Sequence, residues 1–378
     1  MKAIAHAWLA LMALERLKAP KKSKAFKKSF LGKNFDGYFL GNNFDECFRE
    51  QAESFVNFFD KHKDAFVKGA WFPDSVISDN LTGGHTFKLK KPSNSKEEKE
   101  SIFIKNRIPK HLSSLKDLGI GEKELEIKVF KNGKYTLPDR CEALAHSIRD
   151  EMLIQNYEPK GSDVMFNDDQ ITLYFLMLSH YLADAHVPPH CDSRDFYGPS
   201  KIHPDMESYW DKEIIKFYEF DKKRKVFDYD INGAPELTAG KEKEFKKSFL
   251  FRAIKKLSER KWKLKKIKGK LADKEILGNG NKKIYDYVKA ICFASYLISI
   301  DFIPEKIKES DYKKIKILKN PKYKKKLDIL SCCVIADAID SIALVWLLTW
   351  EKYSKLEQQK KLKIRAIRKE GRIRKRVF

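Results

Sequence analysis

The segment from Ile329 to Trp350 constrains the fold most, because it is almost wholly apolar and long enough to cross a lipid bilayer. About 20 apolar residues in a helix are sufficient for that. Asp337 and Asp340, however, lie in the middle of the segment. A carboxylate at the centre of a bilayer costs about 2.5 to 3.5 kcal/mol or more. The segment therefore predicts a helix that is buried in a protein core.

The apolar pattern along the rest of the chain is also mostly helical. Pro188 and Pro189 mark the end of one helix, since proline supplies no backbone donor and restricts the residue before it. Pro204 is a favoured first-turn residue and marks the start of another. No convincing period-2 strand set or internal repeat is present, so the sequence predicts an all-α, multi-helix fold. The predicted helices span residues 3–18, 44–68, 138–156, 168–187, 204–220, 246–265, 282–300 and 327–370.

Polar, Lys-rich stretches separate these helices and suggest the domain organisation. Residues 69–88 are predicted to form a loop, and residues 89–135 an exposed insertion. We expect residues 1–220 to form the main domain and residues 221–378 to continue it with further helices. The basic residues from Lys360 to Arg376 predict a C-terminal tail that is either solvated or able to bind phosphate groups.

The chain has a strong excess of positive charge, with 77 Lys and Arg residues against 53 Asp and Glu residues. The resulting field favours phosphate-bearing partners, such as nucleic acid or an anionic membrane surface. Genomic base bias can produce the same composition. The sequence carries no signal for the oligomeric state.

The cysteines and the N-terminus favour a cytoplasmic protein. The first helix resembles a signal peptide between Ala3 and Leu14, but it contains His6 and continues into a charged amphipathic pattern. We therefore expect an uncleaved N-terminus. The cysteines are scattered, include no CxxC pair and predict reduced thiols; they are Cys47, Cys141, Cys191, Cys292, Cys332 and Cys333.

Two pairs of metal-binding residue types occur at helical spacing within a short stretch. His180 and Asp184 are four residues apart on one predicted helix, and His203 and Glu207 are four apart at the start of the next. Residues i and i+4 share a face of a helix, so each pair can bind one ion. His190 follows the two prolines and can return toward the same region. Imidazole and carboxylate groups are the usual ligands of zinc.

This stretch resembles the zinc-dependent phospholipase C family, whose relatives are the zinc-dependent single-strand nucleases. The first predicted helix, with His6-Ala-Trp-Leu-Ala-Leu, matches the family's first-helix histidine, and Gly69-Ala-Trp-Phe-Pro-Asp74 looks like its Asp-bearing loop. His85, after Gly83-Gly84, fits the next histidine. The matches run in the family's order from residue 1 to about residue 220. They leave the insertion and the C-terminal region uncovered.

The resemblance implies about three zinc ions and assigns their ligands. The third ion would use His6, the second oxygen of Asp184 and the amino and carbonyl groups of Met1, since Met1 lies five positions before His6. The first two ions would be bound by Asp74, His85, His180 and Asp184 and by His190, His203 and Glu207, respectively. His186 falls on another face of its helix and is expected to be structural.

The resemblance further implies a phosphodiesterase that hydrolyses phosphoester bonds with a metal-bound hydroxide. Asp184 would bridge the metal ions, and Asp74 would steer or deprotonate the attacking water. Glu at position 207 and the spacing from His190 to His203 look more like the phospholipase branch. Ser75 and Thr82 stand where that branch has choline-binding aromatics, so phosphatidylcholine specificity is not implied.

Two alternatives stay open. The first is a nuclease for single-stranded DNA or RNA, which the basic composition and five aromatic residues around the predicted site would suit, unless these aromatics belong to the core. They are Trp71, Phe72, Phe87, Phe196 and Tyr197. The second is an inactive, structural metal-binding protein.

Overall fold

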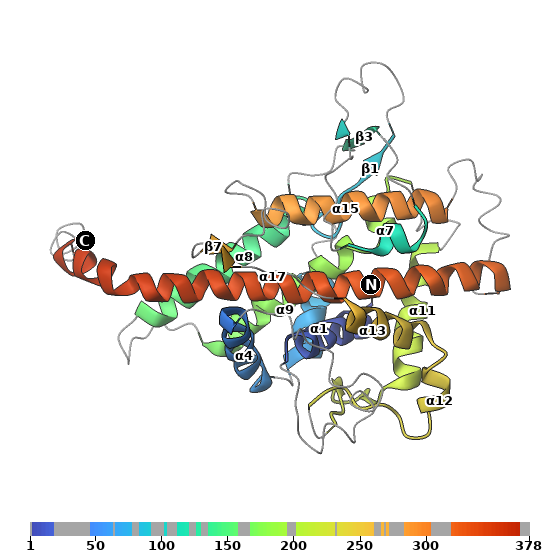
Figure 1. Cartoon of the computed structure of the whole chain (residues 1–378), viewed down its shortest axis with the longest axis horizontal. Coiled ribbons are helices and arrows are strands. Elements are labelled where there is room, and N and C mark those ends of the chain that lie inside the picture. Colours follow the sequence, from blue (N-terminus) through green and yellow to red (C-terminus); the bar gives the residue numbers. More distant parts are fainter. Residues whose placement is uncertain are drawn as a thin grey trace.

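The computed structural model of the chain is built almost entirely of α-helices, which confirms the predicted all-α class (Figure 1). The described residues are 2–18, 46–62, 65–77, 83–91, 102–103, 112–120, 126–129, 135–157, 167–194, 202–230, 233–260, 266–267, 270–271, 283–303 and 319–370.

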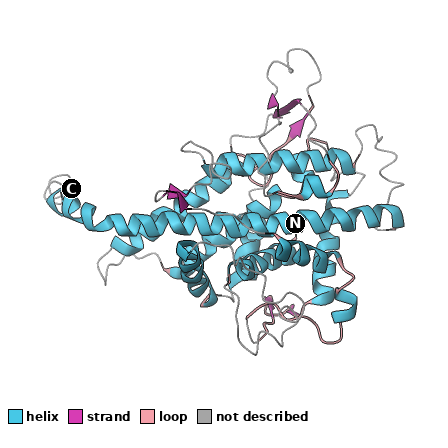
Figure 2. Cartoon of the chain, viewed as in Figure 1, coloured by secondary structure: helices cyan, strands magenta, loops and turns pink. Residues whose placement is uncertain are grey.

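Twelve α-helices and one π-helix lie in the described residues (Figure 2). The N-terminal helices are α1 (Ala3–Leu17), α4 (Glu46–Asp60), α5 (Phe66–Phe72), the π-helix η2 (Pro73–Ile77) and α7 (Ser114–Asp117). The central helices are α8 (Leu137–Tyr157), α9 (Asp168–Ala185), α10 (Pro188–Cys191) and α11 (Ile202–Phe217). The C-terminal helices are α12 (Glu242–Phe245), α13 (Phe249–Glu259), α15 (Lys283–Phe302) and α17 (Pro321–Glu370).

Short antiparallel strands, which the sequence pattern did not predict, form three small sheets. The first has the order β1-β3-β2 and consists of β1 (Leu89–Lys90), β2 (Ile102–Phe103) and β3 (Glu126–Val129). Two hairpins pair β4 (Phe220–Asp221) with β5 (Val226–Phe227), and β6 (Lys266–Ile267) with β7 (Lys270–Leu271). Strands of two to four residues are too short to show a period of two in the sequence.

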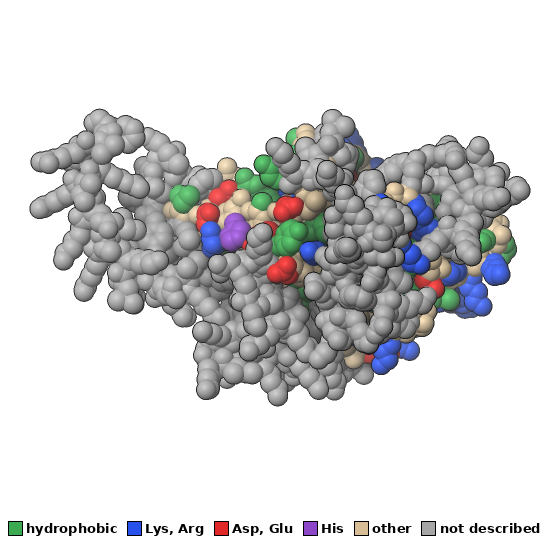
Figure 3. Space-filling view, turned by 90° about the horizontal axis from the view of Figure 1, so that it is seen from above, with side chains coloured by type: hydrophobic (Ala, Val, Ile, Leu, Met, Phe, Trp, Pro, Cys, Tyr) green, Lys and Arg blue, Asp and Glu red, His purple; other side chains and the backbone are tan. Residues whose placement is uncertain are grey.

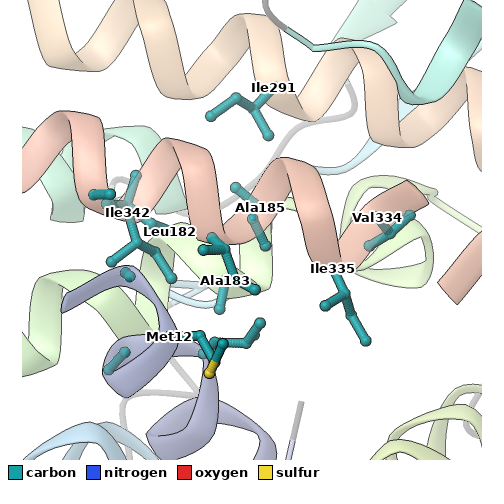
Figure 4. Close-up of a cluster of buried hydrophobic side chains, with 14 of the residues drawn as sticks. Met12, Leu182, Ala183, Ala185, Ile291, Val334, Ile335 and Ile342 are labelled. Atoms are coloured by element: carbon teal, nitrogen blue, oxygen red, sulfur yellow. The ribbon is translucent and has the colours of Figure 1, made fainter. Parts of the chain in front are cut away.

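Helix α17 runs the length of the molecule and forms its core axis (Figure 1). Its stretch from Pro321 to Trp350 is the one segment of the described chain that is long and apolar enough to span a bilayer, and 94% of the apolar window is buried inside the protein. It packs on α1, α8, α9 and α13. Figure 4 shows its Ile335 and Ile342 among Met12 of α1, Leu182 of α9 and Ile291 of α15. The predicted buried core helix is thus confirmed.

The two carboxylates of this helix are paired with arginines from neighbouring helices. Arg16 Nε of α1 donates to Asp340 Oδ1 over 2.9 Å. Arg260 Nη1, just after α13, lies 2.7 Å from Asp337 Oδ1 and 3.1 Å from Asp340 Oδ2. Burial opposes the charge of Arg260, but the two carboxylates prevail and raise its pKa. Charges that are paired in this way are tolerated in a protein core.

One hydrophobic cluster joins the two predicted regions, so residues 1–220 and 221–378 have no separate cores. Helix α17 contacts α1, α8 and α9, and α15 contacts α8 and α10. The predicted exposed insertion at 89–135 is partly wrong: Lys91, Lys116 and Asp117 are exposed, but Leu89, Leu112 and Ile120 are buried and α7 packs against α17.

The predicted loop at 69–88 is also partly wrong, since residues 69–77 are helical. Gly69 lies inside α5, where the sequence predicted that it would end a helix. Its role is close packing: a Cβ at this position would lie 2.5 Å from Leu176 Cδ1 and 2.9 Å from Leu176 Cβ of α9. The predicted helix 44–68 is interrupted, with α4 ending at Asp60 and α5 beginning at Phe66.

Candidate metal centre

Helix α9 carries the central residues of the site, and its start is fixed by a capping box. Gln170 N donates to Asn167 Oδ1 over 2.9 Å, and Asn167 N donates to Gln170 Oε1 over 3.0 Å. These bonds satisfy two backbone donors at the helix end. From this start the helix places His180 and Asp184 on one face, where both are almost completely buried.

His85, His180 and Asp184 form the first group of metal-binding side chains. Asp184 Oδ2 lies 2.8 Å from His85 Nδ1 and 3.3 Å from His180 Nε2. The two ring nitrogens are 3.2 Å apart. Residues 99 positions apart thus present their donor atoms to one small volume.

Asp74 and His6 extend this group from two other elements. Asp74 Oδ1, in η2, lies 3.6 Å from His180 Nε2 and 3.7 Å from His85 Nδ1. His6, in α1, stacks on His180 with ring centroids 3.7 Å apart, and its Nε2 lies 3.4 Å from Asp184 Oδ1. His6, Asp74 and His180 can themselves hold an ion. The two oxygens of Asp184 therefore face different histidines, as a bridging carboxylate requires.

His190, His203 and Glu207 form a second buried group. Glu207 Oε1 lies 2.7 Å from His203 Nε2 and 3.3 Å from His190 Nε2. His190 comes from α10, and the other two come from α11. His190 Nδ1 lies 3.8 Å from Asp184 Oδ1, which connects this group to the first.

Backbone carbonyls fix the ring orientation of two of the histidines. His180 Nδ1 donates to the carbonyl of Ala70 over 2.7 Å, and His190 Nδ1 donates to that of His85 over 2.6 Å. In each ring this leaves Nε2 as the atom with a free lone pair on the side of the carboxylates. Histidines that bind metals are commonly held by such a second hydrogen bond.

The spacing of the donor atoms fits a divalent cation. Two donors on one tetrahedral zinc ion, bound at about 2.0–2.1 Å, lie about 3.3–3.4 Å apart. The nitrogen–nitrogen and nitrogen–oxygen distances in the two groups, at 2.7–3.7 Å, lie around this value. Three buried groups of His, Asp and Glu residues can therefore hold metal ions.

The pKa values of three of these buried groups favour the protonation states that metal ligands need, whereas burial lowers the pKa of His180 but Asp184 prevails and raises it. Burial lowers the pKa of His203 to about 4, with the nearby His190 acting in the same direction. Burial likewise lowers the pKa of His6. Burial alone would raise the pKa of Asp184, but the positive charge of the N-terminal amine, together with the surrounding histidines, holds it well below the usual range. Neutral imidazoles and ionised carboxylates are the forms that bind zinc.

A pocket of about 590 Å³ opens onto both groups. Its lining residues are Lys2, Ala3, Trp71, Asp74, His85, Thr86, Asp184, His190, His203, Glu207 and Asp211. Six of the eight metal-binding side chains thus lie where a small substrate can reach them, whereas His6 and His180 lie behind the pocket wall.

Asp211 is a lining residue that the sequence interpretation missed. Its Oδ1 accepts a hydrogen bond from Ala5 N over 2.8 Å, so a side chain of α11 caps the start of α1 near His6. Burial raises its pKa to about 6. Its position four residues after Glu207, on the same helical face, is the signal that could have identified it.

The structure brings together all eight side chains that the sequence assigned to the metal site. Met1 lies outside the described residues, as do Phe196 and Tyr197. His186 points away from the groups, and its Nε2 lies 2.9 Å from Ser341 Oγ. Of the predicted aromatics, Trp71 lines the pocket, whereas Phe87 is buried in the core.

The chain was compared with models of known protein families, with curated proteins and with solved structures, and none of the three comparisons gives a match. A functional assignment therefore depends on the residues of the site and on their geometry.

Proposed function

We propose that the chain is a zinc-dependent phosphodiesterase of the phospholipase C type. The observation that carries the proposal is the convergence of eight His, Asp and Glu side chains from five helices and one loop around Asp184. A structural zinc site is a closed shell of four ligands, whereas the eight side chains here exceed what one such site needs and most of them line an open pocket.

Three zinc ions would be held as the resemblance implies. Asp74, His85, His180 and Asp184 would bind the first. The second would be bound by His190, His203 and Glu207. His6 and the other oxygen of Asp184 would contribute to the third, and the 3.4 Å between His6 Nε2 and Asp184 Oδ1 supports that pairing.

When bound, zinc supplies a nucleophilic water at neutral pH and offsets the charge of a phosphate group. The chain's own residues would orient the metal site and handle the proton. Asp184, fully buried and facing histidines on both sides, fixes the separation of the two groups. Asp74 is the more exposed carboxylate, with 31% of its side chain accessible at the pocket wall. It is therefore the candidate that can accept a proton from water entering the pocket.

We infer a phospholipid substrate from the features shared with the phospholipase branch, Glu207 and the spacing of His190 and His203. A nuclease for single-stranded DNA or RNA is the second candidate, and the positive balance of the whole chain favours it. The scattered cysteines support a cytoplasmic location, because all five described ones are free.

Metal analysis combined with two substrates tests this function. Untagged protein should contain about three zinc ions per chain, release a phosphorylated headgroup from phospholipid vesicles, and lose that activity in a chelator. Cleavage of single-stranded DNA or RNA without lipid hydrolysis would establish the second candidate instead. Fewer than two zinc ions per chain and no hydrolysis of either substrate would leave a structural metal-binding protein.

A further inference from the structure

A basic hairpin stands beside the metal pocket. Strands β4 and β5 are joined by a turn of four consecutive basic residues, Lys222 to Lys225, and all four are exposed. The next two residues, Val226 and Phe227, are buried and anchor the hairpin in the protein.

The turn has a defined shape, so it presents its charges in a fixed place. Asp221 Oδ1 accepts hydrogen bonds from Lys223 N over 2.8 Å and from Arg224 N over 2.9 Å. Lys225 N donates to the carbonyl of Asp221 over 2.8 Å. Lys225 adopts a left-handed conformation with φ of 56°, which lysine rarely does and which the turn imposes.

Lys225 connects the hairpin to the pocket. Its Nζ lies 4.4 Å from the centre of the Trp71 ring, a cation–π contact, and Trp71 lines the pocket with Asp74. Lys225 therefore holds the basic turn against a residue of the pocket lining.

An apolar turn follows Asp74 directly along the chain. Val76 and Ile77, two and three residues after Asp74 in η2, have 67% and 39% of their surface exposed. They are two of the five large hydrophobic side chains that are exposed in the described part of the chain. Two adjacent β-branched aliphatic residues beside a polar pocket have no role in the core.

We propose that the basic hairpin and the apolar turn together bind the surface of an anionic phospholipid bilayer and hold the metal pocket against it. The inference deepens the proposed function and rests on it, since it names the physical form of the lipid substrate. Basic side chains are attracted to anionic headgroups, and aliphatic side chains can enter the boundary between headgroups and acyl chains.

The same residues fit a single nucleic-acid strand less well. Unpaired bases bind by stacking on exposed aromatic faces. Among the described residues around the pocket the ring available for this is Trp71, and Lys225 covers one of its faces. Val76 and Ile77 offer no flat ring to a base, but they are suitable for acyl chains.

Vesicle binding tests the proposal independently of the metal chemistry. The full-length protein, kept in a chelator, is sedimented with vesicles of phosphatidylcholine alone or with about one third phosphatidylserine. We expect binding to the anionic vesicles only. Each basic residue near such a surface contributes about fivefold to binding. The triple variant Lys222→Gln, Lys223→Gln, Arg224→Gln should therefore bind more weakly by on the order of a hundredfold.

A matched control removes the same charge elsewhere. Figure 3 shows Lys and Arg side chains exposed also at the end of the molecule where α17 begins. Lys319, Lys322 and Lys325 are exposed there and do not line the pocket. Replacing these three by Gln should leave vesicle binding nearly unchanged. Val76→Ser with Ile77→Ser should reduce binding to anionic vesicles by roughly tenfold, because burial of an aliphatic side chain is lost.

Three results would overturn the proposal: equal losses in the hairpin and control variants, no effect of the two serines, or binding of a single-stranded oligonucleotide with none to vesicles. Circular dichroism of each variant shows that it is folded. Zinc is absent from these binding assays, so a negative result would contradict membrane binding without contradicting the zinc content and hydrolysis expected under the proposed function. Conversely, a protein without zinc or hydrolytic activity would contradict the proposed function without changing the vesicle-binding result.

Discussion

Replacing Asp184 with Asn should remove two of the three proposed zinc ions and leave one. Asp184 Oδ2 faces His85 and His180 at 2.8 and 3.3 Å, and Oδ1 faces His6 at 3.4 Å. Two proposed ions therefore share this carboxylate. The remaining ion relies on His190, His203 and Glu207, which contact one another. An amide has nearly the same shape but no charge, so it cannot bridge two cations.

The effect can be expressed as a free energy of unfolding. An ion present at about one hundred times its dissociation constant stabilises the folded protein by about 2.7 kcal/mol. Zinc should thus stabilise the unchanged protein by about 8 kcal/mol, and the Asp184→Asn variant by about 2.7 kcal/mol. Glu207→Gln should lose only one ion and retain about 5 kcal/mol.

The assay is guanidinium unfolding with and without chelator, together with elemental analysis of zinc per chain. For each protein, the free energy of unfolding in chelator is subtracted from that in zinc, so any effect of the substitution on the stability of the zinc-free protein cancels. His186→Ala is the control, because His186 contacts Ser341 and belongs to none of the metal-binding groups. Equal zinc loss in the Asp184 and Glu207 variants, or full zinc content in Asp184→Asn, would refute the shared-carboxylate arrangement.

Three further predictions concern single residues. His203 has a folded-state pKa of about 4 against an ordinary 6.5, so the folded protein binds fewer protons than the unfolded chain between these values. Through this group, zinc-free protein should therefore lose about 2 kcal/mol of stability as the pH falls to 5, and His203→Gln should lose about 2 kcal/mol less than the unchanged protein between pH 7.5 and 5 in urea unfolding. Arg260→Ala leaves the buried carboxylates of α17 without this partner and should lower the free energy of unfolding by about 3–5 kcal/mol. Lys256→Ala, which breaks a more exposed ion pair, should lower it by less than about 1 kcal/mol. Equal losses for the two variants in urea unfolding would contradict the difference in burial between the two ion pairs. In Gly69→Ala the new methyl group should press on Leu176, lower the free energy of unfolding by about 1–3 kcal/mol and weaken zinc binding by displacing α5. Adding Leu176→Ala should restore part of the zinc affinity, measured by competition with a chelator. If it restores none, the steric explanation is ruled out.

The helical class and the centre of the site could be predicted from the sequence because both depend on local spacing. His180 with Asp184, and His203 with Glu207, share a helix face whatever the rest of the chain does. The acids of the apolar segment favoured a protein core over a bilayer on the grounds of charge alone. His6, Asp74 and His85 are separated from these pairs by long stretches, and no spacing rule relates them. The family resemblance pointed to them, and the fold brings them within a few ångströms.

Other features depend on contacts between distant segments and had no local signal. The strands are held by pairing rather than by a pattern of alternation. Gly69 looked like a helix end, but it is a packing position set by Leu176 of another helix. The residues 89–135 are rich in charge, and yet Leu112 and Ile120 are buried in the hydrophobic core, beside the short helix α7 that packs against α17.

The sequence by itself therefore determined that the chain is helical, that its most apolar helix lies in a protein core, and which short pairs can bind a cation. Only the tertiary structure decided which partners neutralise Asp337 and Asp340, how far the donor atoms of the site lie from one another, and that Asp211 caps α1 beside His6. The physical reason is that helix periodicity is a property of a few consecutive residues. Ion pairing, close packing and metal geometry depend on distances between segments that the order of residues alone does not specify.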